Sequence, residues 1–246
     1  MLFDRLRHEV KLAWKTMLLA PMLAAAPVGL IAALQRVHGE NPAHVLLAGI
    51  EMLLPIAAGV MVAATVAHDD ALELHLTTPR PYDRTTMLRL LVIAGWTALL
   101  AALATAAVAR LGLLREPPFA RLVSPLARVP LTELVWLAPL LWLVGAGLCL
   151  GMLTKSRTAG GALLGGIWLL DILSTGVIAQ TSWLRPFLLF PATLVIYPAS
   201  AVSRADFDTY WLNTRFGLLA MALALLPLGW LLLRNSEALL KGATEE

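Results

Sequence analysis

Acidic and histidine side chains gather in one hydrophilic stretch between two long apolar segments, HDDALELHLTTPRPYDRTTMLRL (residues 68–90). His68 and His75 lie seven residues apart, so a helix would place them on one face, where neighbouring carboxylates could complete a metal site. Such sites are rare, whereas acidic residues in a polar connection are usually solvated or face a partner. The sequence therefore favours a solvated or partner-facing surface here and predicts no bound metal.

The same stretch contains the start and stop of a short helix. Asp69 and Asp70 can accept hydrogen bonds from the free backbone N–H groups of a first helical turn. Pro79 and Pro81 end the helix after about two turns, because proline lacks an N–H and disfavours helical geometry in the residue before it. A short helix between two apolar segments suits a mechanical contact better than a catalytic pocket.

The predicted helix is amphipathic. Leu72 and Leu76 fall on one face, and Glu73 and Thr77 fall on another. We expect the leucines to enter a groove of a partner while the carboxylates meet basic residues at its rim.

Motifs for catalysis within the chain are missing. Residues 151–156 (GMLTKS) lack the glycine before lysine that a phosphate-binding loop requires, and no strand precedes them. Neither a Gly-x-Ser-x-Gly elbow nor a His-Glu-x-x-His helix occurs. We predict that the chain is not an enzyme and carries no cofactor, so any ATP and magnesium would be bound by a separate polypeptide.

Two carboxylates interrupt apolar segments. Asp171 lies near the middle of GGIWLLDILSTG, where burying a carboxyl costs roughly 2.5–3.5 kcal/mol. Two interpretations stay open for it: a structural group bonded to Ser174 or Thr175, or a residue lining a substrate path or a subunit seam, where it could present the only charge at mid-membrane depth. The same choice arises for Glu51, but its position nearer a segment end favours a side chain that reaches the headgroups.

Composition places the chain in a membrane. Of its 246 residues, 59% are hydrophobic and 14% are charged, and the mean hydropathy is +0.77. A soluble domain has about 25% charged residues. The net charge of +3 comes from basic residues at segment ends, which anionic headgroups account for, so no nucleic-acid partner is expected. The single cysteine, Cys149, is expected to be a small packing residue.

Six apolar segments are each close to the roughly 20 residues that cross a bilayer as a helix. The predicted fold is therefore all-α and polytopic, in a single domain of residues 1–246. The predicted spans are 16–34, interrupted by Pro21 and Pro27, then 45–67, 90–109, 131–153, 158–178 and 216–233.

Two further elements and an orientation are predicted. Residues 1–15 have leucine, valine and tryptophan at helical spacing among basic residues, which indicates an interfacial helix. Residues 183–198 are apolar, broken by three prolines and shorter than a crossing, which indicates a re-entrant element. The N-terminal basic cluster and the turn at 155–157 favour cytoplasmic N- and C-termini in the cell membrane.

Glycines four residues apart occur twice, at Gly147 and Gly151 and at Gly161 and Gly165. Such spacing lets helices approach closely, most often within a subunit, and a dimer seam is the alternative.

Residues 72–79 (LELHLTTP), followed by a basic segment that enters the next apolar run at Arg89, resemble the cytoplasmic coupling helix of ABC type-2 exporter permeases. Asp70 and Ala71 stand where that family usually has Gly-Thr, and His75 stands where it usually has leucine. The resemblance also covers the interfacial helix, the six spans and a re-entrant extracellular element before the sixth.

The resemblance implies a permease subunit that pairs with a second copy, identical or not, and with cytoplasmic ATP-binding cassette ATPase subunits. The docking residues would be those of the predicted coupling helix, namely Asp69, Asp70, Leu72, Glu73, Leu76 and Thr77. An apolar lining would suit a hydrophobic or amphiphilic substrate. The alternative is a six-span membrane protein that transports nothing, such as an assembly factor or sensor that binds a cytoplasmic partner through residues 69–78.

Overall fold

The computed structural model describes residues 2–67, 82–113, 124–191 and 204–234, and within these ranges the secondary structure is helical without a strand. The predicted coupling helix, residues 68–81, lies outside the described residues, as do 192–198 of the predicted re-entrant element. The elements are α1 (Leu2–Val37), α2 (Ala43–Ala48), the π-helical turn η1 (Gly49–Leu53), α3 (Leu54–Ala67), α5 (Tyr82–Arg110), α6 (Pro125–Thr154), α7 (Arg157–Gln180), the 3₁₀ turn η3 (Arg185–Phe187) and α9 (Arg204–Arg234).

Six of the described helical segments are long and apolar enough to cross a membrane, which confirms the predicted all-α fold at this level and indicates a multi-pass membrane protein. The second segment is made by α2, η1 and α3, which follow one another without a break. The six segments are Leu19–Val37, Ala43–Ala67, Arg84–Arg110, Ala127–Thr154, Arg157–Ile178 and Trp211–Arg234.

The first helix differs from the sequence prediction. It runs from Leu2 to Val37 without interruption, past both Pro21 and Pro27. A membrane helix tolerates proline because local adjustments and neighbouring helices satisfy the freed carbonyl groups. The segment 1–15 is therefore continuous with the first span over its described residues, and its placement at the headgroup level stays a prediction.

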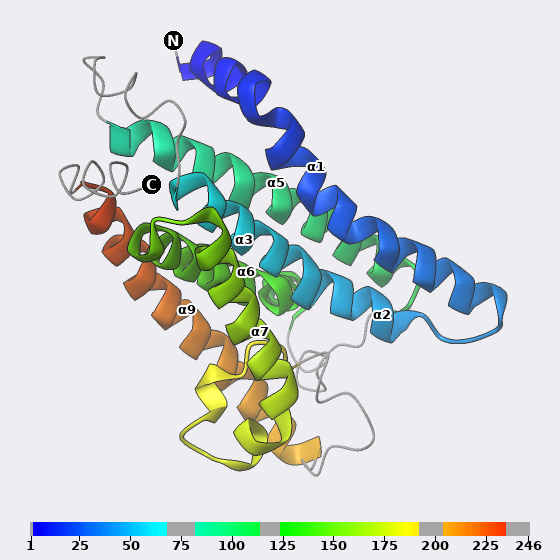
Figure 1. Cartoon of the computed structure of the whole chain (residues 1–246). Helices are drawn as coiled ribbons and strands as arrows, with labels where there is room; N and C mark the ends of the chain where they lie inside the picture. Colours follow the sequence, from blue (N-terminus) through cyan, green and yellow to red (C-terminus); the bar gives the residue numbers. More distant parts are fainter. Residues whose placement is uncertain (1, 68–81, 114–123, 192–203, 235–246) are drawn as a thin grey trace.

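Helices α3 and α6 form the centre of the bundle (Figure 1). Of the most apolar part of the α6 span, 72% is buried within the chain, and the same part of the α2–α3 span is 56% buried. The corresponding part of the α7 span is only 11% buried, although α7 contacts both central helices. The apolar outer surfaces of α7 and the other peripheral helices are those that lipid or a partner subunit would cover.

Glycines bring α3 and α6 into backbone contact. A Cβ atom at Gly151 would lie 2.6 Å from the carbonyl oxygen of Ala63, and one at Gly59 would lie 2.8 Å from that of Leu143. Gly147 likewise faces the backbone of Gly59. Gly147 and Gly151, the first of the two predicted glycine pairs, therefore serve helix packing within the subunit.

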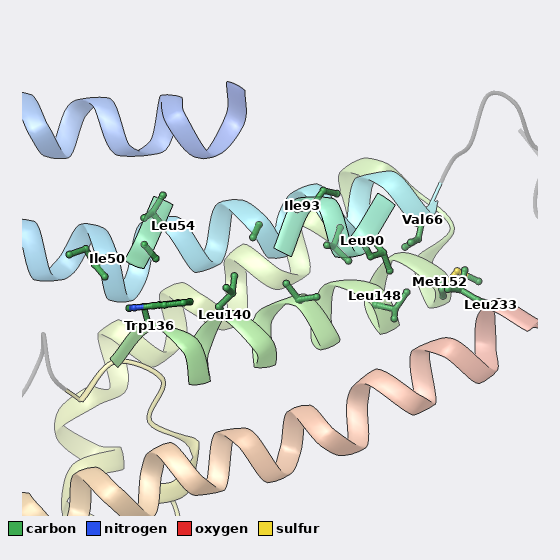
Figure 2. Close-up of a cluster of buried hydrophobic side chains, with 14 of the residues drawn as sticks. Ile50, Leu54, Val66, Leu90, Ile93, Trp136, Leu140, Leu148, Met152 and Leu233 are labelled. Carbon is green, nitrogen blue, oxygen red and sulfur yellow. The ribbon is translucent and has the colours of Figure 1, made fainter. Parts of the chain in front are cut away.

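Apolar side chains fill the spaces around this contact. Ile50, Leu54 and Val66 along the second span meet Trp136, Leu140 and Leu148 of α6 in one buried cluster, to which Leu90 and Ile93 of α5 and Leu233 of α9 also belong (Figure 2). The cluster extends along nearly the full length of α3. Because close-packed apolar interiors resist deformation, α3 and α6 are expected to move as one body.

The helices alternate in direction, so the bundle has two distinct ends. Helices α3 and α9 finish at the end where α5 begins (Figure 1). We call this the 67/82 end. The turn between α6 and α7 joins them through Lys155, whose φ of 51° caps α6, and through Ser156, whose hydroxyl accepts a hydrogen bond from the N–H of Ala159. The α1–α2 connection and η3 lie toward the opposite end.

Candidate functional site: a buried charge network

Three ionisable side chains from three different spans are buried toward the opposite end of the bundle. Glu51 in η1 and Arg215 in α9 are 0% exposed, and Asp171 in α7 is 6% exposed. Each lies within about three helical turns of the end of its span. Burying charges in an apolar bundle costs several kcal/mol per ion unless each is paired or hydrogen-bonded, so the contacts among them decide whether the arrangement is stable.

Arg215 is the centre of the network. Its Nη2 donates to Oε1 of Glu51 in a buried ion pair. Its Nη1 donates to the carbonyl oxygen of Leu189 at 3.1 Å. The guanidinium carbon also lies 5.6 Å from the centroid of the Trp211 ring, one turn earlier in α9, where a cation–π attraction contributes. A planar guanidinium can hold two acceptors at fixed angles in this way, which a lysine ammonium cannot do as specifically.

Asp171 completes the network from the other side of Leu189. Both of its carboxylate oxygens face the backbone N–H of Leu189, at 3.2 and 3.3 Å. The N–H and the C=O of one residue are therefore held by side chains of α7 and α9 respectively. Leu188, Leu189 and Phe190 around this point are 0%, 2% and 0% exposed.

The segment that carries Leu189 follows η3. Pro186 lies within this short 3₁₀ turn, after which Leu188 takes an extended backbone conformation. An extended segment has no helical partners for its backbone groups, and buried groups of this kind must find other partners. Asp171 and Arg215 supply them for Leu189, which gives these two side chains a definite structural task.

Glu51 lies in the π-helical turn within the second span. Such single turns inside helices occur often at functional sites, because they shift side chains out of the regular α-helical register. On the same turn, a Cβ atom at Gly49 would lie 2.5 Å from Val28 Cγ1, so α1 packs closely against it. The turn that carries Glu51 therefore packs against α1, while the carboxylate is paired with Arg215.

Several sequence predictions are corrected by these contacts. Glu51 does not extend to the headgroups, because it is fully buried and paired with Arg215. Asp171 is not the only buried charge within the spans, since Glu51 and Arg215 accompany it. The hydroxyl of Thr175 donates to the backbone oxygens of Asp171 and Ile172, at 2.9 and 2.8 Å, so it is the N–H of Leu189 that bonds the carboxylate.

Sequence reasoning missed Arg215 because the predicted span began at residue 216, which left the arginine in a connection. The apolar span within α9 in fact begins earlier, at Trp211, and includes Arg215. Two carboxylates inside apolar segments call for a cation, and Arg215 was available for that role. The role of Leu189 could not be found from residue type, because its backbone makes the contacts.

Asp69, Asp70, Leu72, Glu73, Leu76 and Thr77 lie outside the described residues, so their role in docking stays a prediction. Within the part of the chain that is described, no three metal-ligating side chains come together. A Cβ atom at Gly161 would lie 3.3 Å from Val60 Cγ1, whereas nothing lies within 4 Å of one at Gly165.

Comparisons of the chain with protein-family models, with curated proteins and with solved structures found no match.

Proposed function

We propose that this chain is the transmembrane subunit of an ATP-binding cassette exporter and moves a hydrophobic or amphiphilic substrate with energy from a separate ATPase. The observation that carries the proposal is the course of one span. It joins residues 68–81, the predicted docking segment, at the 67/82 end, and it contains Glu51 of the buried charge network toward the other end. A force applied at residues 68–81 would reach that network through one continuous span.

The packing of α3 supports this role. Backbone contacts at Gly59 and Gly151 and the buried cluster around Leu54 and Leu148 bind α3 to α6 along most of its length. A helix held in this way transmits displacement without bending. The buried charge network at the far end of this span includes side chains of α7 and α9 and the backbone of Leu189 after η3. A shift of α3 would therefore displace groups in three further parts of the chain.

The partners follow from the sequence resemblance. A cytoplasmic ATPase, with ATP and magnesium, would dock on Asp69 to Thr77, with both termini of the permease on the same side. A second permease copy would complete the path. The exposed apolar face of α7, including Leu170, Leu173 and Val177, suits contact with lipid, with that second copy or with an apolar substrate.

The test is complex formation with an ATP-binding cassette ATPase whose gene adjoins that of this chain. Co-expression should give a complex that survives affinity purification, and Glu73→Arg should reduce both its yield and its substrate-stimulated ATP hydrolysis. Glu40→Arg makes the same charge change at an exposed site in the α1–α2 connection and should leave both unchanged. Equal complex yield and equal hydrolysis for Glu73→Arg and the parent would count against docking at this segment. If no ATPase binds, the assembly-factor or sensor alternative is favoured.

A further inference from the structure

The segment Leu188–Phe190 is held in the bundle by its own backbone polar groups. The N–H of Leu189 donates to Asp171 of α7, and its carbonyl accepts from Arg215 of α9. The side chains of Leu189 and Phe190 belong to a buried apolar cluster that includes Leu164, Leu218 and Met52, and Leu188 is buried as well. Lifting the segment out would therefore require that both polar contacts break together.

One of these two contacts depends on a third helix. Arg215 reaches the Leu189 carbonyl while its other terminal nitrogen is bound to Glu51. A buried guanidinium without its carboxylate is strongly unfavourable, so the arginine must follow Glu51 if the second span shifts. The position of Arg215, and with it the hold on Leu189, is thus set from η1 and α3.

One hydrogen-bond donor of the network lacks a partner. Arg215 Nε is buried and has no hydrogen-bond partner among the described residues. The Nε–H is a donor left unsatisfied in this arrangement, which raises the free energy of the closed state relative to one in which water or another acceptor reaches it.

We propose that Glu51, Arg215, Asp171 and Leu189 form a latch that keeps residues 188–190 closed against the bundle and opens when the second span moves relative to α9. In the closed state Arg215 bridges Glu51 and the Leu189 carbonyl. In the open state the carbonyl and the N–H of Leu189 bond to water, and residues 188–190 become accessible. Only the source of the opening force rests on the proposed function, since the latch itself can be tested without the ATPase.

The experiment measures the accessibility of a cysteine in the segment. Cys149→Ala removes the native thiol, and Leu188→Cys then places a reporter at a site that is 0% exposed. The labelling rate with a maleimide reports the open fraction when opening and closing are fast. Trp183→Cys, at a position 70% exposed on the same connection, is the matched reporter that should label rapidly in every background.

Two latch variants each remove one of the two side-chain contacts of Leu189, and neither leaves half of the Glu51–Arg215 ion pair behind. Glu51→Leu with Arg215→Met deletes the ion pair, and such replacements of buried pairs by apolar residues usually keep a protein folded. Asp171→Leu deletes the acceptor of the Leu189 N–H. Losing a hydrogen bond to a charged group should raise the labelling rate of Leu188→Cys about tenfold in each background, while the Trp183→Cys rate stays constant.

Folding of each variant is judged by its thermal unfolding midpoint and by a single symmetric peak in size-exclusion chromatography. A folded variant of either kind in which Leu188→Cys labels as slowly as in the parent overturns the latch. If the double variant does not fold, Asp171→Leu alone decides in the same way.

A further measurement separates this proposal from the proposed function. In the complex with the ATPase, ATP should raise the Leu188→Cys labelling rate, and the uncoupling variant Glu73→Arg should abolish that rise. If the latch variants raise the labelling rate but ATP does not, the ATPase is not the source of the opening force, and the latch is retained. If the complex with the ATPase forms but the latch variants label as slowly as the parent, the latch is refuted and the proposed function is retained.

Discussion

Arg215 of α9 donates to the carboxylate of Glu51, a residue that lies 164 positions earlier in the chain, and both side chains are fully buried. This ion pair joins the second and the sixth span. It also fixes the guanidinium that holds the carbonyl of Leu189. The contact thus links the ends of two spans to a segment that belongs to neither.

Removing one partner of the pair should destabilise the protein much more than removing both. Arg215→Met or Glu51→Leu alone leaves a buried charge without compensation, which costs about 3–5 kcal/mol. The double variant should have a thermal unfolding midpoint close to that of the parent in detergent. Glu40→Leu, an exposed control, should change little. Equal and additive effects of the two single substitutions would contradict an energetic coupling between Glu51 and Arg215.

The carboxyl of Asp171 should be replaceable by an amide but not by a hydrocarbon. Asp171→Asn keeps an oxygen that can accept from the N–H of Leu189, so its unfolding midpoint should stay near that of the parent. Asp171→Leu leaves that N–H unpaired inside the bundle, which costs about 1–3 kcal/mol. Comparison of the two variants by thermal unfolding checks this, and equal midpoints would show that the Leu189 N–H does not need Asp171.

Alanine at Gly151 should destabilise the bundle although alanine favours helix. The new Cβ would meet the backbone oxygen of Ala63 at 2.6 Å, which forces α3 and α6 apart. Overpacking of this kind costs about 1–3 kcal/mol. Gly95→Ala on the exposed face of α5 has nothing within 4 Å and should gain up to about 1 kcal/mol from helix propensity. A Gly151→Ala variant as stable as Gly95→Ala would refute the close contact.

The thiol of Cys149 should be protected in the folded protein. It is buried in α6 and donates to the carbonyl oxygen of Leu225 in α9 at 3.3 Å. Buried structural thiols react slowly because the reagent reaches them only when the bundle opens. A membrane-permeant maleimide should therefore label native protein far more slowly than protein unfolded in dodecyl sulfate. Rapid labelling of the native protein would place Cys149 at an accessible surface.

The number and approximate bounds of the spans were predictable from the sequence, because each crossing must satisfy its backbone groups internally and bury about 20 apolar residues in a row. The run from residue 45 to residue 67 and the run from 131 to 153 both correspond to observed helices. The polar turn between α6 and α7 was predicted for the same reason. Prolines misled the prediction in α1, where Pro21 and Pro27 suggested an interruption that the helix does not have.

The pairing of Glu51 with Arg215 was decided by tertiary structure alone. Residue type shows that a buried carboxylate needs a partner. It does not show which basic residue of the chain will face it, and the one that does lies 164 positions away. The same holds for Asp171, whose partner is a backbone N–H that no side-chain pattern reveals. Apolar runs by themselves specify which segments can enter the membrane, because the free energy of transfer from water depends on the composition of each segment. Which buried polar groups then meet depends on how α3, α7 and α9 pack together, which local composition does not encode.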